Sequence, residues 1–460
     1  MSGLQWIRDR DSEVSLSFPS QISSLRSDRS LSRAVESPLV RGGLTLVAGV
    51  LIGNVLGFGR VALAAALLGM HSRADSLAVA MGPVDTLNSV LINSIVFAFV
   101  PMLTAREGAE RIGLFRRLAR AYLWISSGLC VVLVCAAPWL MRVLAPGLDA
   151  EAFRHAVAIL RILAFSSIAA GTGAVQCAIL YTDRRFAPTA FYQAALNGFT
   201  ILCALLLWKA LGVYAFALGY TLGAWAQLGI VWFAARSHAR GPVAAVSLPW
   251  REMLSKPVFF VVYAAGLGLN ITFTRAYATH IGPGMAAALD YCMRGVGVPL
   301  ALLVNPISNS LLPEIARLRS LGRPREALRL IDRTIALTAA IAIAGCIFAL
   351  VFREAGIRII YQRGQFTAQE TRVAAAVFLG LGPSLVGWSL IEIASRSLFA
   401  LDQRWPQVIS VVVPLVVNIW FTMQLHSTSA QLLGAGASLG LSLGFVVLFT
   451  LLHTGRKRWV

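Results

Sequence analysis

The sequence predicts an all-α, polytopic membrane protein of about twelve transmembrane helices, arranged in two six-helix lobes related by an internal repeat. The first observation is composition, because 57% of the 460 residues are hydrophobic and only 13% are charged, with a mean hydropathy of +0.72. A soluble domain of this composition would expose large apolar patches. The second observation is that apolar runs of about 20 residues recur, the length that crosses roughly 30 Å of hydrocarbon. The third is a repeat between the two halves of the chain.

The apolar runs form two sets of six, each run bounded by charged residues, Pro or Gly. A polar segment, RSHARGPVAAVSLPWREMLSK (236–256), separates the two sets. We expect spans near 43–68, 76–103, 119–144, 153–181, 187–208 and 211–235, and then near 257–279, 284–313, 330–353, 373–400, 406–424 and 430–453. The predicted organisation is therefore a polar cytoplasmic tail (1–42), an N-lobe (43–235), a cytoplasmic linker (236–256), a C-lobe (257–454) and a basic C-terminal tail (455–460).

Basic residues predict the orientation of these spans. With twelve spans, the Arg-rich tail, the loops after spans 2, 4 and 8, the linker and the C-terminus all lie on one side, and the opposite loops hold few basic residues except Arg353, Arg358 and Arg363. Cytoplasmic loops carry the excess of Lys and Arg, so both termini are predicted to be cytoplasmic. The same asymmetry accounts for the net charge of +19, and no nucleic-acid partner is expected.

The halves of the chain echo one another in sequence. FVPMLTAREG (99–108) matches LLPEIARLRS (311–320), TDRRFAP (182–188) matches LDQRWP (401–406), and LGYTLG (218–223) matches LGLSLG (439–444). The matches keep their order, and an even number of spans per repeat gives both halves the same orientation. Two such lobes around a cleft favour an alternating-access carrier over a channel.

Ionisable side chains inside spans are costly unless they face protein or a watery cavity, which makes each a candidate for function. Arg60 lies inside the first span, where the alternatives are a snorkelling arginine and a cavity-facing cation that meets an anionic substrate. Asp290 and Arg294, like Glu392 and Arg396, are four residues apart and could be local ion pairs. Arg275 has no acidic neighbour at helical spacing. The other polar candidates in the spans are Asp85, Asn88 and Asn93.

The sequence lacks the motifs of membrane-bound enzymes and nucleotide-driven pumps. It contains no DxD, GxSxG, HExxH or Walker sequence and no His/Cys cluster with metal-ligand spacing. We therefore expect a transporter without catalytic residues, metal or cofactor, driven by an ion gradient, the membrane potential or downstream use of its substrate. Asp85, Asp290 and Glu392 are the candidate ion-coupling residues.

Collinear motifs over residues 44–420 resemble the MviN/MurJ family of lipid II flippases, within the superfamily that also holds multidrug extruders and polysaccharide exporters. LGFGR (56–60) with Leu68, Gly69 and Asp75 resembles the first-span pattern of the family, and AFVPML (98–103) resembles the end of its second span. The segments AILYTDRRFAPTAF (178–191), LDYCMRGVGVPLALLVNPISNSLLPEIAR (289–317) and YQRGQFT (361–367) are similar to later family segments.

The resemblance implies a role for the arginines. In the family, cavity arginines meet the pyrophosphate of an undecaprenyl-linked saccharide, and Arg60, Asp75 and Arg294 match family positions. Forked, permanently charged guanidinium groups suit a diphosphate. Asn54 and Asn88 stand where the family has further arginines, so Arg275 and Asn88 complete the predicted substrate-binding set of Arg60, Arg294, Arg275, Asn88 and Asp75.

The prediction is a flippase in the bacterial inner membrane that moves an undecaprenyl-pyrophosphate-linked saccharide, either lipid II or an exopolysaccharide repeat unit, by alternating access. Membrane lipids and cell-envelope polysaccharide assembly enzymes are the expected partners. A cation-coupled small-molecule antiporter of the same superfamily is the alternative, and a non-transporting scaffold of a polysaccharide assembly complex is a third reading.

Overall fold

The computed structural model describes residues 38–239, 244, 258–401, 403, 405–425 and 429–459. The predicted polar tail up to residue 37, most of the predicted linker, and the repeat residues Asp402 and Arg404 lie outside the described residues. The described part of the chain is helical and contains no strand, which confirms the all-α fold class.

The first set of predicted spans corresponds to helices that precede residue 236. Two of the spans are broken, because α5 passes into α6 at Phe165 and the short α7 passes into α8 at Phe191. The helices are α2 (Pro38–Leu68), α3 (Ser72–Thr104), α4 (Gly108–Leu144), α5 (Ala150–Ala164), α6 (Ser166–Thr182), α7 (Ala187–Ala190), α8 (Tyr192–Leu211) and α9 (Tyr214–Ala235), followed by the 3-10 turn η1 (Arg236–Ala239).

The second set follows the same plan. Span 8 is α12, a π-helical turn η2 and α13, in which Pro299 precedes the turn and Pro306 follows it. The helices are α11 (Val258–Ile281), α12 (Met285–Pro299), η2 (Leu300–Val304), α13 (Asn305–Ser320), α14 (Pro324–Val351), α15 (Arg353–Tyr361), α16 (Ala368–Leu381), α17 (Ser384–Ala400), α18 (Trp405–Leu425), the 3-10 turn η3 (Ala430–Leu432) and α19 (Ala435–Trp459).

Eleven segments of the described chain are long and apolar enough to cross a membrane. Helix α11, at the position of the seventh predicted span, is not among them, but its 24 residues exceed the roughly 20 that a membrane span needs. Most predicted boundaries extend by a few residues, as for α3, which begins at Ser72 rather than 76.

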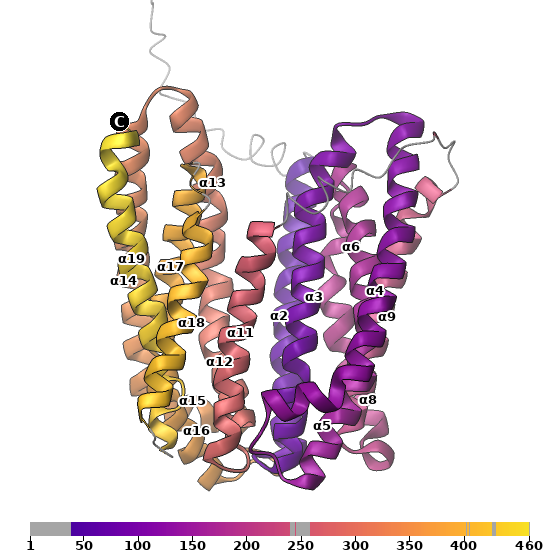
Figure 1. The fold of residues 1–460 in the computed structure, drawn as a ribbon, viewed down its shortest axis with the longest axis vertical. Helices are drawn as coiled ribbons and strands as arrows, with labels where there is room; N and C mark the ends of the chain where they lie inside the picture. The colour runs from indigo at the N-terminus through magenta and orange to yellow at the C-terminus, as the bar shows by residue number, and fades with distance from the viewer. Residues whose placement is uncertain are drawn as a thin grey trace, which may run out of the picture. The chain divides into compact units, whose positions relative to one another are not determined.

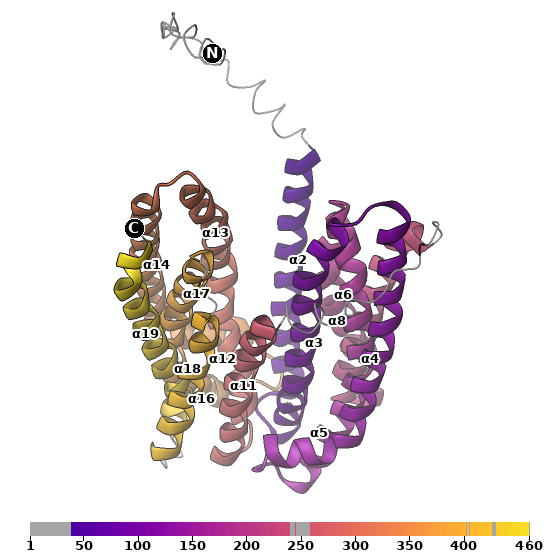
Figure 2. The same ribbon diagram turned by 45° about the horizontal axis from the view of Figure 1, so that its top comes forward.

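Within residues 48–459 the helices gather in two groups that match the predicted lobes. Figures 1 and 2 draw α2 to α9, in indigo to magenta, beside one another, and α11 to α19, in rose to yellow, as a second group. Helix α3 packs against α5 and α6 of its own group and against α11 and α12 of the other. Helices α3 and α11 approach closely at two glycines. A Cβ added to Gly82 of α3 would meet Arg275 of α11, and a Cβ added to Gly268 of α11 would meet Thr86 of α3. Helix α3 is therefore the main element that positions residues between the two groups.

Candidate functional site

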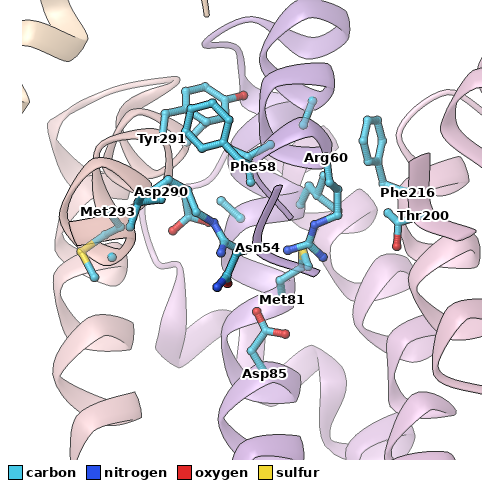
Figure 3. Close-up of a pocket in the computed structure, with 18 of the residues that line it drawn as sticks. Asn54, Phe58, Arg60, Met81, Asp85, Thr200, Phe216, Asp290, Tyr291 and Met293 are labelled. Carbon is cyan, nitrogen blue, oxygen red and sulfur yellow. The ribbon is translucent and has the colours of Figure 1, made fainter. Parts of the chain in front are cut away.

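A cavity of about 550 Å³ lies between the two groups of helices. Its size is within the range of small-molecule sites in proteins. Helices α2 and α3 line it from one side and α11, α12 and η2 from the other, with single contributions from α8 and α9. The lining is largely apolar, and its charged members are Arg60, Asp85, Arg275, Asp290 and Arg294. Figure 3 shows how Arg60, Asp85 and Asp290 lie around this space.

Arg60 is held by α2 with its guanidinium almost fully enclosed. The residue is 8% exposed, and its Nη1 atom has no hydrogen-bond partner in the described part of the chain. The guanidinium carbon lies 5.7 Å from the ring centroid of Tyr220, a separation at which the ring face attracts a cation. A buried donor without an acceptor is costly. Arg60 thus brings a positive charge to the cavity lining, with one N–H donor group unsatisfied within the described residues.

Asp85 faces the cavity from α3 and is fixed by an aromatic hydroxyl. The Tyr220 hydroxyl of α9 donates to its Oδ1 atom at 2.7 Å. Asn88, one turn further along α3, donates through Nδ2 to the Ser166 hydroxyl at 3.0 Å and does not line the described cavity. The structure therefore places Asp85 in the site and Asn88 behind it.

The second group supplies two arginines and a carboxylate. Arg275 of α11 donates through Nε to Asp290 Oδ1 of α12 at 2.6 Å, and their side chains are 14% and 22% exposed. Arg294, one turn beyond Asp290, makes no ion pair within the described residues. The local Asp290–Arg294 pair that helical spacing allows is replaced by a shorter bond to the neighbouring helix.

Asp75 lies beside the cavity rather than in its lining. Its carboxylate, 1% exposed in the first turn of α3, accepts the backbone N–H groups of Gly284 and Ala287, the latter at 2.8 Å. A carboxylate at a helix N-terminus satisfies orphan N–H groups and complements the helix dipole. Asp75 thus caps α12 across the boundary between the two groups.

Further hydrogen bonds join the groups around this cap, at what we call the closed end (residues 66–75, 284–291 and 361–370). The Tyr291 hydroxyl donates to the Gly69 carbonyl at 2.9 Å, and the Gln365 N–H donates to the Ala66 carbonyl at 2.8 Å. The Met70 N–H donates to Glu370 at 2.7 Å. The YQRGQFT segment therefore holds the turn between α2 and α3.

The cavity opens away from the closed end. Its lining runs from Leu68 and Ala74, which are buried beside that end, to Leu51 and Leu302, which are 44% and 45% exposed. One end is tied by hydrogen bonds between the two groups, and the other reaches the surface between α2 and η2.

Glu392 lies outside this cavity. On α17 its Oε1 atom pairs with Arg396 at 2.6 Å, as four-residue spacing predicts, and its Oε2 atom accepts the Tyr263 hydroxyl at 3.0 Å. No acid from α17 lines the cavity in the described part of the chain. The three predicted ion-coupling residues are thus divided, with Asp85 and Asp290 in the cavity lining and Glu392 outside it.

Sequence reasoning missed the aromatic residues of the site. Tyr220 lies within LGYTLG, which stands out in the sequence only as part of the internal repeat, and Tyr291 immediately follows Asp290. The available signal was a tyrosine inside an apolar span, because a buried phenol usually finds a hydrogen-bond partner. Its partner, some 135 positions away in the case of Tyr220 and Asp85, is not visible in a local pattern.

Known proteins match this chain in sequence over most of its length. A family model described as lipid II flippase MurJ matches residues 64–459. The lipid II flippase MurJ of Burkholderia cenocepacia is 26% identical over 448 residues, covering 92% of this chain and 84% of the relative. A probable lipid II flippase MurJ of Rhizobium meliloti is 24% identical over 412 residues, with 85% and 76% covered.

Two solved structures share the fold at low identity. One, a lipid II flippase MurJ in an inward closed conformation, has a TM-score of 0.77 at 17% identity and covers 89% of this chain and 87% of its own. The other, an inward-facing multidrug resistance MATE transporter of the MOP superfamily, has a TM-score of 0.76 at 12% identity, with 90% and 98% covered. The fold is common to both kinds of transporter, whereas the matches in sequence are to flippases.

Proposed function

The chain belongs to the lipid II flippase MurJ family, and on that premise we propose that it moves an undecaprenyl-pyrophosphate-linked saccharide across the inner membrane by alternating access. Like the flippases it matches, it is a multi-pass membrane transporter and not an enzyme. The saccharide is either that of lipid II or an exopolysaccharide repeat unit. The observation that carries the proposal is that three arginines, Arg60, Arg275 and Arg294, line one cavity between the two groups of helices.

A diphosphate fits the donors of this cavity. Arg60 and Arg294 bring guanidinium groups from opposite sides, and their charges repel one another when nothing lies between them. An anion placed there relieves the repulsion and accepts charge-assisted hydrogen bonds, which are roughly twice as strong as neutral ones. We assign the substrate phosphates to Arg60 and Arg294, with Arg275 as a third donor.

Alternating access fits the hydrogen bonds at the closed end. The cap of Asp75 on α12 and the bonds of Tyr291 and Gln365 tie the two lobes on one side of the cavity. We propose that this side faces the periplasm and that both termini are cytoplasmic, so that the headgroup enters from the cytoplasmic leaflet. Rocking of the lobes would then break these bonds and open the other side.

The membrane potential has the right sign to drive outward transport of an anionic headgroup. The interior of a cell is negative, so outward movement of a negative headgroup is favourable by about 2.3 kcal/mol per charge for each 100 mV. An ion gradient could act through Asp85 and Asp290, which line the cavity, or through Glu392 outside it. We further propose that the protein works beside cell-envelope polysaccharide assembly enzymes, which supply or consume the lipid-linked saccharide.

The antiporter alternative rests on the two cavity carboxylates, since an acid in a lobe is the usual site of an exchanged cation. The alternatives separate in one experiment, in which the chain is expressed in cells depleted of their resident lipid II flippase. Growth that is rescued by the wild type and lost with Arg60→Ala and Arg294→Ala supports a lipid II flippase. Arg73→Ala is a matched control, because this arginine is 66% exposed and pairs with Glu151 outside the cavity.

Absence of rescue, with loss of secreted polysaccharide on deletion in the native host, supports the exopolysaccharide unit. Absence of both effects, with cation-dependent drug resistance conferred by the chain, would overturn the flippase proposal in favour of the antiporter.

A further inference from the structure

The ion pair between Arg275 and Asp290 occupies a donor that the proposed substrate would need. Both residues line the cavity, and the bond between Nε and Oδ1 is 2.6 Å long. Asp290 also interacts electrostatically with Arg294, which makes no ion pair in the described chain. One carboxylate thus lies between two of the three cavity arginines.

Arg275 is confined to this position by the lobe opposite its own. A Cβ added to Gly82 on α3 would lie 2.9 Å from Arg275 Nη1, so a larger residue there would displace the guanidinium. Gly82 therefore lets an arginine of α11 lie against α3 and still face the cavity. The same guanidinium meets the glycine with Nη1 and the carboxylate with Nε.

The charges of the cavity are nearly balanced without substrate. Three arginines face two carboxylates, of which Asp85 is held by Tyr220 and Asp290 by Arg275. An arriving diphosphate adds at least two negative charges beside Asp290. Because like charges at close range are unfavourable, the phosphate and Asp290 cannot both use Arg275 at full strength.

We propose that Asp290 is a built-in competitor of the substrate, a positioning residue that holds Arg275 in the empty cavity and gives it up to the second phosphate. When the headgroup leaves, Asp290 takes Arg275 back, so its carboxylate lowers affinity and speeds release. This inference rests on the proposed function. It also predicts that Asp290 affects binding of a diphosphate and not of a monophosphate. A monophosphate bound by Arg60 and Arg294 has no second anionic group to displace Asp290 from Arg275.

Binding of two lipids to the full chain in nanodiscs tests the competitor. The probes are undecaprenyl pyrophosphate and undecaprenyl phosphate, and the variant is Asp290→Asn, which keeps the shape and removes the charge. We expect about tenfold tighter binding of the pyrophosphate, the gain of one charge-assisted bond without competition, together with slower release after a rapid dilution. The matched control is Glu314→Gln, which breaks an equally short ion pair with Arg317 outside the cavity and should leave both affinities unchanged.

A second variant covers a failure of Asp290→Asn to fold, because that substitution leaves Arg275 as an unpaired, largely buried cation. The double variant Arg275→Gln/Asp290→Asn removes both partners and keeps the net charge. It should bind the pyrophosphate about tenfold more weakly than the wild type, since one donor is gone, and bind the monophosphate equally well.

The outcomes separate the two proposals. Pyrophosphate affinity that is unchanged or weaker in Asp290→Asn, with a wild type that binds, overturns the competitor and leaves the flippase standing, as would equal pyrophosphate affinity in the double variant and the wild type. A wild type that binds neither lipid overturns both.

Discussion

The cap that Asp75 places on α12 makes a quantitative prediction for Asp75→Asn. The carboxylate accepts two backbone N–H groups and faces a helix N-terminus while 1% exposed. Asparagine keeps one acceptor oxygen in place but loses the charge. A hydrogen bond to a charged group contributes about 1.5–3 kcal/mol, and the dipole adds about 0.3–1 kcal/mol, so we expect the closed end to weaken by about 2–4 kcal/mol. That corresponds to roughly 30- to 700-fold more frequent opening.

Amide hydrogen exchange measures this opening directly. The backbone amides of Gly284 and Ala287 should exchange faster by that factor in Asp75→Asn. The affinity for the headgroup, measured while the closed end is intact, should change far less in Asp75→Asn than in Arg60→Ala. Asp149→Asn is the matched control, because Asp149 caps α5 through the Ala152 N–H at 2.7 Å within one lobe. Unaltered exchange at 284–287 in Asp75→Asn would refute the assignment of this carboxylate to the closed end.

Three further predictions follow from the same geometry. Arg60→Ala should lower headgroup affinity at least about tenfold by removing a charged donor. Asn88→Ala, outside the cavity lining, should lower it less. Titration with undecaprenyl pyrophosphate measures both affinities. Gly364→Ala should lower the melting temperature, since φ is +61° and the added Cβ would collide with the Ala66 carbonyl oxygen; an unchanged value would contradict this contact. The pKa of Asp149 is lowered, chiefly because the carboxylate accepts the Ala152 N–H, so its stabilisation is present above the ordinary aspartate pKa of about 4 and is lost as pH falls through the lower, folded-state value. Asp149→Ala should abolish this contribution to the fall of the melting temperature at acidic pH, as melting temperatures measured over a series of pH values would show.

The helices were predictable because the membrane imposes a length and a composition that the sequence displays directly. Spans 4, 5, 8 and 10 nevertheless contain breaks that hydropathy does not register, such as the π-helical turn Leu300–Val304. Pro299 and Pro306 were visible on either side of it, but a proline predicts a disturbance and not its type.

The charged residues of the site were predictable one at a time, whereas their pairing was not. Arg60, Arg275 and Asp290 stand out because charge inside a span is rare. Helical spacing offers only partners three or four residues away, so it identifies Glu392 with Arg396 and overlooks Asp290 with Arg275. The cap of Asp75 joins residues more than 200 positions apart, and the role of Gly82 depends on which helix lies against it.

Two helices connect the closed end to the charged cavity. Helix α3 carries Asp75 at its start and Asp85 ten residues later, and α12 begins at the amides that Asp75 caps and carries Asp290 and Arg294 within its next turns. At 1.5 Å per residue, the cap and the cavity charges are separated by about 15 Å of rigid backbone on α3 and by about 5–15 Å on α12. An anion that draws Arg60 of α2 and Arg294 of α12 together acts directly on α12, and it acts on α3 through the short turn that joins α2 to α3. If binding shifts those helices as rigid bodies, the bonds at the closed end are the first to change, and a headgroup-dependent rise in exchange at 284–287 would follow in the wild type and be absent in Arg294→Ala.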